Sequence, residues 1–422
     1  MGDARHGALH GALGLGLAAD PTADAPRWAA LWRPAPDGAD TPGTLVWSGP
    51  EARLPRKLAA RVPRGGWAAD VLRLTPPLTD HHVHGGDGVD AATSPTAALR
   101  TWLGRRRRAG VGAVLASLPA LSAADLAAAL ERLAPLVHEG ALAGVHLEGP
   151  FLSPARAGAH HPGVLCTPDS PAGQAVLAVL RQVPEGVVRT VTLAPELPGA
   201  ERLGAELAGT GIVPCPGHTD ADARTIGAAV ERWAAASEAW SSGAASSAVG
   251  REPVVTHLFN AMRPFHHRDP GPLPTLLAAA RRGRVRAEVI ADGVHVAPEL
   301  LQLLFEDPAL APQLVLVSDA VAATDAPAGV DLRLGPATVH AGDDAPRLGP
   351  ASAGTEACPP LAGGARDLTA SVSALLRAGL PADAVLRAAV HTPRRSLPER
   401  TPPPGILVWT HDGGRRVLLP AP

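Results

Sequence analysis

The sequence predicts an α/β fold, a (β/α)8 TIM-like barrel with a small β-domain formed from the two ends of the chain. Short apolar runs alternate with Ala- and Leu-rich helical stretches, most of the runs end in His, Asp or Glu, and the C-terminal residues carry a hairpin pattern. With 422 residues, 46% hydrophobic and 18% charged, the chain is long enough for a barrel with an appendage.

Residues 1–75 are predicted to contribute to the small β-domain. Residues 1 to about 70 are rich in Pro, Gly and Asp and contain one strand-like piece, Thr44 to Trp47, with no helical period. Residues 396–422 are predicted to complete this domain. Within them, Ile406 to Trp409 and Val417 to Leu419 flank the turn Asp412-Gly413-Gly414, which is the pattern of a β-hairpin.

Residues 76–395 are the predicted barrel domain, and eight apolar runs, the first of which begins just before residue 76, are its predicted strands. The runs are Val71 to Leu74 leading to His84, Val111 to Leu118, Leu142 to Leu147, Val187 to Leu193, Gly211 to Cys215, Pro253 to Leu258, Val285 to Ile290 and Gln313 to Val317. Predicted helices are Ala123 to His138, Ala172 to Arg181, Ala221 to Ala236, Pro298 to Phe305, Leu368 to Ala378 and Ala382 to Ala389. This alternation implies a parallel sheet buried on both faces. A doubly wound sheet fits the same pattern. We interpret 234–250, rich in Ala and Ser, as a surface insertion or loose linker.

Composition argues against several classes of partner. The formal net charge is −2, and the short basic run Arg105 to Arg108 is interpreted as a solvated helix face, so no nucleic-acid partner is expected. Cys166, Cys215 and Cys358 are far apart, which argues against a disulfide framework or a structural zinc site and favours a cytoplasmic location. We recognise neither a signal peptide nor a membrane span, and no membrane partner is expected.

Polar residues at the predicted strand ends suggest a divalent metal site. In a barrel the C-terminal strand ends meet at one mouth, where active sites lie. His82 and His84 are two residues apart and therefore point to the same face of a strand. Glu148, His218 and His257 follow other strands and complete one or two metal sites. Any single buried His is more often structural, but the whole set at strand ends favours a metal site.

Two further residue types bear on this site. Lys57, the single lysine, precedes the barrel, so a carboxylate such as Glu148 must serve where some related barrels use a carbamylated lysine to join two metals. Asp319 follows the last predicted strand and is the natural general base for water activated by a metal. Its structural alternative is the N-cap of a helix beginning at Ala320.

Several segments resemble, in order and spacing, the motifs of the N-acetylglucosamine-6-phosphate deacetylase family of the amidohydrolase superfamily. The segments are Asp80 to Gly86, Gly144 to Leu152, Gly158 to His160, Gly217 to Thr219, Thr256 to Met262, Ala291 to Val296 and Val317 to Ala320. The resemblance runs from about residue 78 to 395 and is most specific around Glu148 and His257. The first 70 residues match the family poorly, and 361–364 and 402–405 also depart from its pattern.

The resemblance implies a role for each site residue. Glu148, His218 and His257 would hold the catalytic metal, and His82 with His84 a second ion. Asp319 would activate water and protonate the leaving amine, while His160 would contact the acetamide or sugar and stabilise the oxyanion. Further substrate contacts are implied for Ala159, Asn260 and Ala261, and contacts to the sugar phosphate for Arg268 and His295. The ion would be Zn foremost, with Fe, Mn or Co as alternatives.

The implied reaction is hydrolysis of N-acetyl-D-glucosamine 6-phosphate to D-glucosamine 6-phosphate and acetate by a cytoplasmic homodimer. One alternative is another amidohydrolase, acting on a different N-acetyl amino sugar or N-acyl compound. An unphosphorylated substrate would give Arg268 and His295 no anion to bind. Another is a non-catalytic barrel that binds a sugar phosphate. Asp319 beside five candidate ligands argues against this second alternative, because a pure binding protein has no use for a base that activates water.

Overall fold

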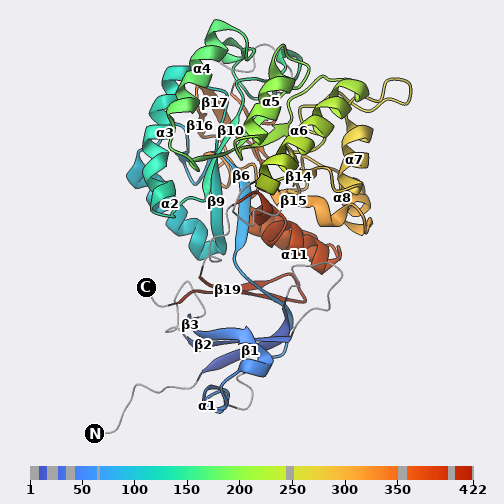
Figure 1. Ribbon diagram of the computed structural model, residues 1–422. Helices are drawn as coiled ribbons and strands as arrows, with labels where there is room; N and C mark the ends of the chain where they lie inside the picture. Colours follow the sequence, from blue (N-terminus) through green and yellow to red (C-terminus); the bar gives the residue numbers. More distant parts are fainter. Residues whose placement is uncertain are drawn as a thin grey trace.

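The computed structural model describes residues 9–16, 27–34, 43–63, 67–243, 251–349, 359–397 and 404–420. It contains a barrel of strands surrounded by helices, and a small β-sheet below it that is formed from both ends of the chain (Figure 1). The predicted α/β fold is therefore confirmed. Cys358 and residues 244–250 of the predicted linker lie outside the described residues.

The barrel is built from eight parallel strands that follow one another in chain order. One sheet contains β6 (Leu78–Val83), β9 (Val111–Leu118), β10 (Gly144–Glu148), β11 (Val188–Leu193) and β12 (Val213–Pro216), and the other contains β13 (Val254–Val255), β14 (Arg286–Ile290) and β15 (Leu314–Val317). The sheets adjoin at both edges. Thr256 N–H donates to the Pro216 carbonyl at 3.1 Å between β12 and β13, and Asp319 N–H donates to the His82 carbonyl at 2.9 Å between β15 and β6. The eight strands therefore form a ring.

Helices surround this ring (Figure 1). They are α2 (Thr96–Ala109), α3 (Ala123–His138), α4 (Pro171–Gln182), α5 (Ala200–Ala208), α6 (Ala223–Gly243), α7 (Leu273–Arg281), α8 (Pro298–Glu306), α10 (Leu368–Arg377) and α11 (Ala382–Val390). Side chains cap three of them: Ser122, Ser170 and Asp367 each accept a backbone N–H of the first turn. None of the helices described here is long and apolar enough to cross a membrane.

The interpretation of 234–250 as a loose linker is wrong for its first ten positions. Helix α6 continues to Gly243, because Ala and Ser are compatible with a helix and this stretch has a buried face. Ala234 and Ser237 are both buried, as is Trp233 just before them. Trp233 also donates from Nε1 to the Glu201 carbonyl on α5 at 2.8 Å. The alanine-rich stretch thus packs as a helix against its neighbour.

The small β-sheet joins the two ends of the chain. Its strands are β1 (His10–Gly16), β2 (Arg27–Pro34), β3 (Gly43–Pro50), β4 (Trp67–Ala68), β5 (Val71–Thr75), β19 (Ile406–Thr410) and β20 (Arg415–Leu418), with the short helix α1 (Arg56–Ala59) after β3. The order is β20-β19-β5-β1-β2-β3, and β4 pairs with β1. The predicted hairpin is confirmed as β19 and β20, which pair antiparallel.

Two predictions about the start of the chain were wrong. Val71 to Leu74 belongs to β5 of the small sheet; Pro76 and Pro77 separate it from β6, the first barrel strand. The sequence also predicted one strand in the first 70 residues, but β1 and β2 lie there as well. Strand β2 buries Ala30 and Trp32 in one apolar cluster and Leu31 in another, so it shows no alternation of apolar and polar residues.

The loop region after Asp319 also contains structure that the sequence did not predict. An antiparallel sheet of β16 (Asp331–Leu334), β17 (Ala337–Ala341) and β18 (Pro346–Leu348) packs against Val321 and Ala323. Shorter elements are β7 (Gly85–Gly86), β8 (Val89–Asp90) and the 3-10 helices η1 (Glu51–Arg53), η2 (Pro154–Arg156), η3 (Pro162–Val164), η4 (Ala311–Gln313) and η5 (Pro393–Ser396). No helix begins directly after Asp319: residues 320 and 321 have no regular structure and 322–325 form a turn, so its interpretation as a helix N-cap is wrong.

A buried carboxylate links the first and last barrel strands. Asp80 on β6 accepts a hydrogen bond from Ser318 N–H at 3.1 Å and another from Ser318 Oγ at 2.6 Å. Burial raises the pKa of Asp80 to about 7, although the hydrogen bonds from Ser318 act in the opposite direction. This contact holds the end of β15 against β6 and so places Asp319 opposite His82 and His84.

We predict that Asp80→Ala destabilises the protein, because it leaves the buried Ser318 groups without their acceptor. The expected loss is about 1–3 kcal/mol for each unsatisfied group, measured as a shift of the denaturant midpoint. Asp80→Asn keeps a carbonyl acceptor at the same position and is the matched control, with a smaller expected loss. A denaturant midpoint for Asp80→Ala equal to that of the wild type would contradict this account of the contact between β6 and β15.

Candidate metal centre

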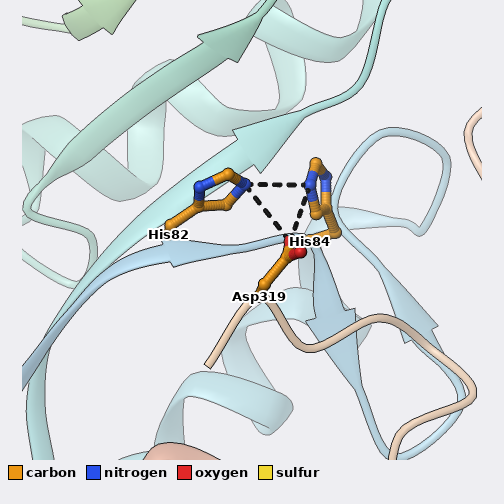
Figure 2. Close-up of side chains that lie close together, drawn as sticks. All are labelled: His82, His84 and Asp319. Atoms are coloured by element: carbon orange, nitrogen blue, oxygen red, sulfur yellow. Dashed lines mark hydrogen bonds and ion pairs between the residues drawn. The ribbon is translucent and has the colours of Figure 1, made fainter. Parts of the chain in front are cut away.

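Two groups of side chains at the C-terminal ends of the barrel strands have the composition of metal sites. They are His82, His84 and Asp319 (Figure 2), and Glu148, His218 and His257; within each group one potential ligand atom per residue lies within 4.8 Å of the others. In the first group, His82 Nε2 is 3.2 Å from His84 Nε2, and Asp319 Oδ1 is 3.3 Å and 3.4 Å from these two nitrogens. The structure thus brings together the six residues in which the sequence predicted metal ligands and a base.

Glu148 connects the two groups. Its Oε1 lies 3.0 Å from His218 Nε2 and 2.9 Å from His257 Nε2. Its Oε2 lies 2.9 Å from His84 Nε2 and 3.5 Å from His82 Nε2. The carboxylate is 3% exposed, and a buried carboxylate requires a compensating positive charge or hydrogen bonds. One acidic side chain therefore contacts four imidazoles from both groups.

In His218 and His82, the hydrogen bond made by Nδ1 shows which ring nitrogen carries the proton and which has a free lone pair. His218 Nδ1 lies 2.8 Å from the Arg156 carbonyl oxygen, and His82 Nδ1 lies 3.1 Å from a Glu288 carboxylate oxygen. Both partners are acceptors, so each Nδ1 carries the proton, and in the neutral ring Nε2 presents a lone pair. These lone pairs face the oxygens of Glu148. A centre that consists of acceptors needs a cation, and a divalent metal ion fits it.

The electrostatics of the side chains agree with this need for a cation. Burial lowers the pKa of His84, but its hydrogen bonds to Asp319 and Glu148 outweigh burial and raise the pKa to about 9. Burial raises the pKa of Glu148, but the charges of His82 and His160 outweigh it and hold that pKa well below its usual range. Burial lowers the pKa of His218 to about 4, so this ring keeps a free lone pair, whereas His84 without a metal ion would take up a proton that a bound cation displaces.

The backbone is strained at three of these residues. His218, His257 and Asp319 have φ angles of 47°, 26° and 48°, in or near the left-handed region that non-glycine residues seldom adopt. Each such residue costs about 1–3 kcal/mol, and such strain is concentrated at functional sites. All three lie just beyond the end of a barrel strand. The turns that place these side chains are therefore maintained at a cost to stability.

A cavity of about 230 Å³ opens beside the two groups. It is lined by His84, Glu148, Gly158, Ala159, His160, His218, His257, Asn260, Ala261, Ile290, His295, Asp319, Val321, Leu334, Pro360, Leu361, Ala362 and Gly363. All the substrate residues predicted from the sequence except Arg268 are in this list. Residues 361–363 line the cavity, as expected from their position in the family pattern, whereas Leu334 of the β16–β18 sheet was not predicted.

The Nε2 atom of His160 differs from that of His218 in carrying a proton. The Ala120 backbone N–H donates to His160 Nδ1 at 3.1 Å, so in the neutral ring the proton is on Nε2. His160 Nε2 lies 3.5 Å from Glu148 Oε2, and the side chain is 5% exposed. The imidazole therefore offers the cavity an N–H donor, which suits a carbonyl oxygen better than a metal ion.

The two residues predicted to bind a phosphate are placed differently. His295 lines the cavity, and its Nδ1 lies 2.7 Å from Asp292 Oδ2. Burial raises the pKa of Asp292, but the hydrogen bond from His295 and its charge outweigh burial and hold the pKa well below its usual range. Arg268 is exposed, donates to its neighbour His267 at 2.9 Å and does not line the cavity. The structure of a single chain does not bring Arg268 to the other site residues.

Sequence reasoning missed Glu288, which is 2% exposed in the middle of β14. Its carboxylate lies 2.7 Å from His81 Nδ1 and 3.1 Å from His82 Nδ1. The available signal was an acidic residue inside an apolar strand, two positions after another buried charge, Arg286. Charged residues are seldom fully buried unless they are paired, so this spacing pointed to a paired group inside the barrel.

Comparison with known proteins identifies relatives that are named as deacetylases of N-acetyl amino sugar phosphates. No protein-family model matches the chain. It is 33% identical over 264 residues to the N-acetylglucosamine-6-phosphate deacetylase of Bacillus subtilis (strain 168), which covers 61% of this chain and 60% of that relative. The N-acetyl-D-glucosamine-6-phosphate deacetylase of Mycobacterium smegmatis, a mutant in complex with N-acetyl-D-glucosamine-6-phosphate, superposes with a TM-score of 0.73 at 28% identity over 97% of both chains.

The chain is related to the N-acetylglucosamine-6-phosphate deacetylases. This confirms the resemblance noted from its motifs. It is also 30% identical over 264 residues to an N-acetylgalactosamine-6-phosphate deacetylase of Escherichia coli O157:H7, covering 62% of this chain and 63% of that relative. The sequence alignments thus span about three fifths of these curated relatives, whereas the structural superposition spans almost the whole chain.

We predict that Glu148→Gln weakens metal binding in both groups, because Glu148 contacts histidines of each. The expected loss is at least about tenfold in affinity, since losing even an outer partner of a ligand costs 10–100-fold. His84→Asn is the comparison variant and should impair the group of His82 and Asp319 more than that of His218 and His257. Metal content after dialysis, measured by atomic emission, checks this. Wild-type content in Glu148→Gln would refute the bridging role.

Proposed function

We propose that the protein is a metal-dependent deacetylase that hydrolyses N-acetyl-D-glucosamine 6-phosphate to D-glucosamine 6-phosphate and acetate. The observation that carries the proposal is one cavity lined by a carboxylate base candidate, Asp319, an N–H donor, His160, and the acceptor cluster around Glu148. The relatives named for this activity support it. A site with these parts can hydrolyse an amide, whereas a binding site does not need a base.

One or two divalent ions complete the proposed site. Glu148, His218 and His257 would hold the catalytic ion, and His82 and His84, with Asp319 beside them, a second. When bound, such an ion polarises the amide carbonyl and lowers the pKa of water. The ligands are imidazole nitrogens and carboxylate oxygens, which suit Zn foremost and also Fe, Mn or Co.

Asp319 and His160 have different proposed roles in the reaction. Asp319 accepts a proton from the attacking water, whose oxygen bonds to the acetyl carbon, and delivers that proton to the departing nitrogen as the C–N bond breaks. His160 donates its Nε2–H to the carbonyl oxygen as negative charge develops there. The products are acetate and the free amine. Asp319 is at contact distance from His82 and His84, which holds its carboxylate in place for both transfers.

The remaining cavity residues are proposed to select the sugar phosphate. Ala159, Asn260 and Ala261 line the cavity and would contact the sugar. His295, held by Asp292, would donate to the phosphate, and Arg268 would add a guanidinium, whose planar donors match a dianion. In a single chain Arg268 is outside the cavity, so its contribution requires a loop movement or a second copy of the chain.

Other features of the protein stay predictions. We propose residues 76–395 as the catalytic domain, and 1–75 with 396–422 as the small β-domain. A homodimer in the cytoplasm remains the expected state.

A second candidate substrate is N-acetyl-D-galactosamine 6-phosphate, because the Escherichia coli relative is named for it. The two sugars differ only in the orientation of one hydroxyl. The candidates therefore share the reaction, the metal and the phosphate contact, and kinetic comparison separates them.

We predict that the metal-loaded protein hydrolyses N-acetyl-D-glucosamine 6-phosphate in preference to its galactosamine counterpart and to unphosphorylated N-acetylglucosamine. Asp319→Asn should lower kcat by about 10²–10⁴-fold, the usual contribution of general acid–base catalysis. Release of acetate by protein reconstituted with Zn, Fe, Mn or Co measures both the substrate preference and the kcat of Asp319→Asn. A folded, metal-loaded protein that releases no acetate from either phosphorylated sugar would exclude the proposed function.

We predict that His160→Ala lowers kcat by about 10²–10³-fold, the cost of losing one oxyanion donor, and leaves the metal content unchanged. We expect unchanged metal content because His160 carries its proton on Nε2, and a protonated nitrogen cannot bind a metal ion. Acetate release and atomic emission on the same sample check the two results. Loss of a metal ion from His160→Ala would instead show that His160 is a ligand.

A further inference from the structure

Glu288 occupies the interior of the barrel behind the candidate metal centre. It is on β14, is 2% exposed and does not line the cavity. A charged group in such a place is costly unless it is paired. Its location away from the cavity means that it contacts neither substrate nor solvent, so a reason for its presence has to be found in its neighbours.

The neighbours of Glu288 belong to both candidate ligand groups. Its Oε2 lies 3.1 Å from His82 Nδ1 and accepts the backbone N–H of His257 at 3.3 Å. Its Oε1 lies 2.7 Å from Nδ1 of His81, which is 1% exposed. The carboxylate is therefore held in one orientation by His81 and contacts one residue of each group.

We infer that Glu288 is a positioning residue that prepares His82 and His257 to bind metal ions. This inference rests on the metal dependence in the proposed function. Glu288 acts through the two histidines and does not itself reach the ion.

The contact with His82 sets which nitrogen of the ring is available. Because Glu288 only accepts hydrogen bonds when ionised, His82 must place its proton on Nδ1, and Nε2 is left as a ligand facing Glu148 and His84. Without the carboxylate, the ring is free to carry its proton on Nε2 or to rotate. Either change removes the lone pair from the centre, which is how outer partners of ligating histidines control affinity.

The contact with His257 acts on the backbone. His257 has a φ of 26°, a strained conformation that persists where surrounding contacts maintain it. The hydrogen bond from its N–H to Glu288 is one such contact, and the Leu258 N–H adds another by donating to the Glu288 carbonyl at 2.8 Å. Since this second bond uses the backbone of Glu288, it survives replacement of the side chain. We therefore expect the group of His82 to depend on the carboxylate more than the group of His257 does.

The test is a calorimetric titration with Zn²⁺, in the absence of substrate, of the metal-free wild type and of metal-free Glu288→Gln. Glu288→Gln keeps the shape of the side chain and removes its charge. We expect one of two binding steps to weaken by about 10–100-fold and the other to change less. A His84→Asn background, in which the first group is already impaired, should show a smaller effect of Glu288→Gln.

The matched control is Asp90→Asn, another carboxylate-to-amide change at a buried position. Asp90 accepts hydrogen bonds from Thr93 and the Gly335 backbone, and its side chain has no hydrogen bond to the six candidate ligands. The metal affinity of Asp90→Asn should therefore change much less than that of Glu288→Gln. Wild-type affinity for both ions in folded Glu288→Gln would overturn the inference. Should Glu288→Gln fail to fold, Glu288→Asp decides, because its shortened side chain keeps the charge but withdraws it from His82, and the same loss of affinity is expected.

The titration separates this inference from the proposed function. Wild type that binds no divalent ion overturns both. Wild type that binds ions, with the expected loss in Glu288→Gln, supports the inference even if neither sugar phosphate is hydrolysed.

Discussion

A carboxylate enclosed by imidazoles is the constraint on which much of this protein depends. Glu148 is buried at the end of β10, within 3.5 Å of Nε2 atoms of His82, His84, His160, His218 and His257. Burying such a charge without compensation is unfavourable, and the rings of His82 and His218 turn lone pairs toward it. A cation compensates the charge of Glu148 and binds these lone pairs at once, whereas His160 contributes an N–H donor. The same cluster that would be destabilising when empty therefore becomes a binding site when filled, which couples metal binding to stability.

The surrounding fold supplies what this cluster needs. The ring of strands brings residues from β6, β10 and the segments after β12, β13 and β15 to one mouth. Contacts behind the mouth hold the strands in register: Asp80 bonds Ser318 between the first and last strands, and Glu288 links β14 to His81 and His82. The strained turns at His218, His257 and Asp319 are affordable because a large core lies beneath them. Buried contacts inside the barrel thus determine where the candidate metal ligands lie at its mouth.

Much of this could be predicted from the sequence. Helices such as α3 (Ala123–His138) follow directly from the apolar period, and His82, His84, Glu148, His218 and His257 stood out because polar residues end otherwise apolar strands. Other features depend on tertiary contacts that no local pattern encodes. Strand β2 is buried on both faces and shows no alternation, Glu288 is recognised only through its partners, and the exposure of Arg268 depends on how its loop folds.

The central claim is that the cluster around Glu148 is a metal site and not a network of protonated imidazoles. Anomalous diffraction from crystals grown with Zn²⁺ tests it most directly, because it locates the ion without reference to activity. The account predicts an anomalous peak about 2.0–2.2 Å from the nitrogens of His218 and His257 and from a Glu148 oxygen. Crystals of protein that is active with Zn²⁺ but shows no peak among these residues, or binds the ion elsewhere, would contradict it.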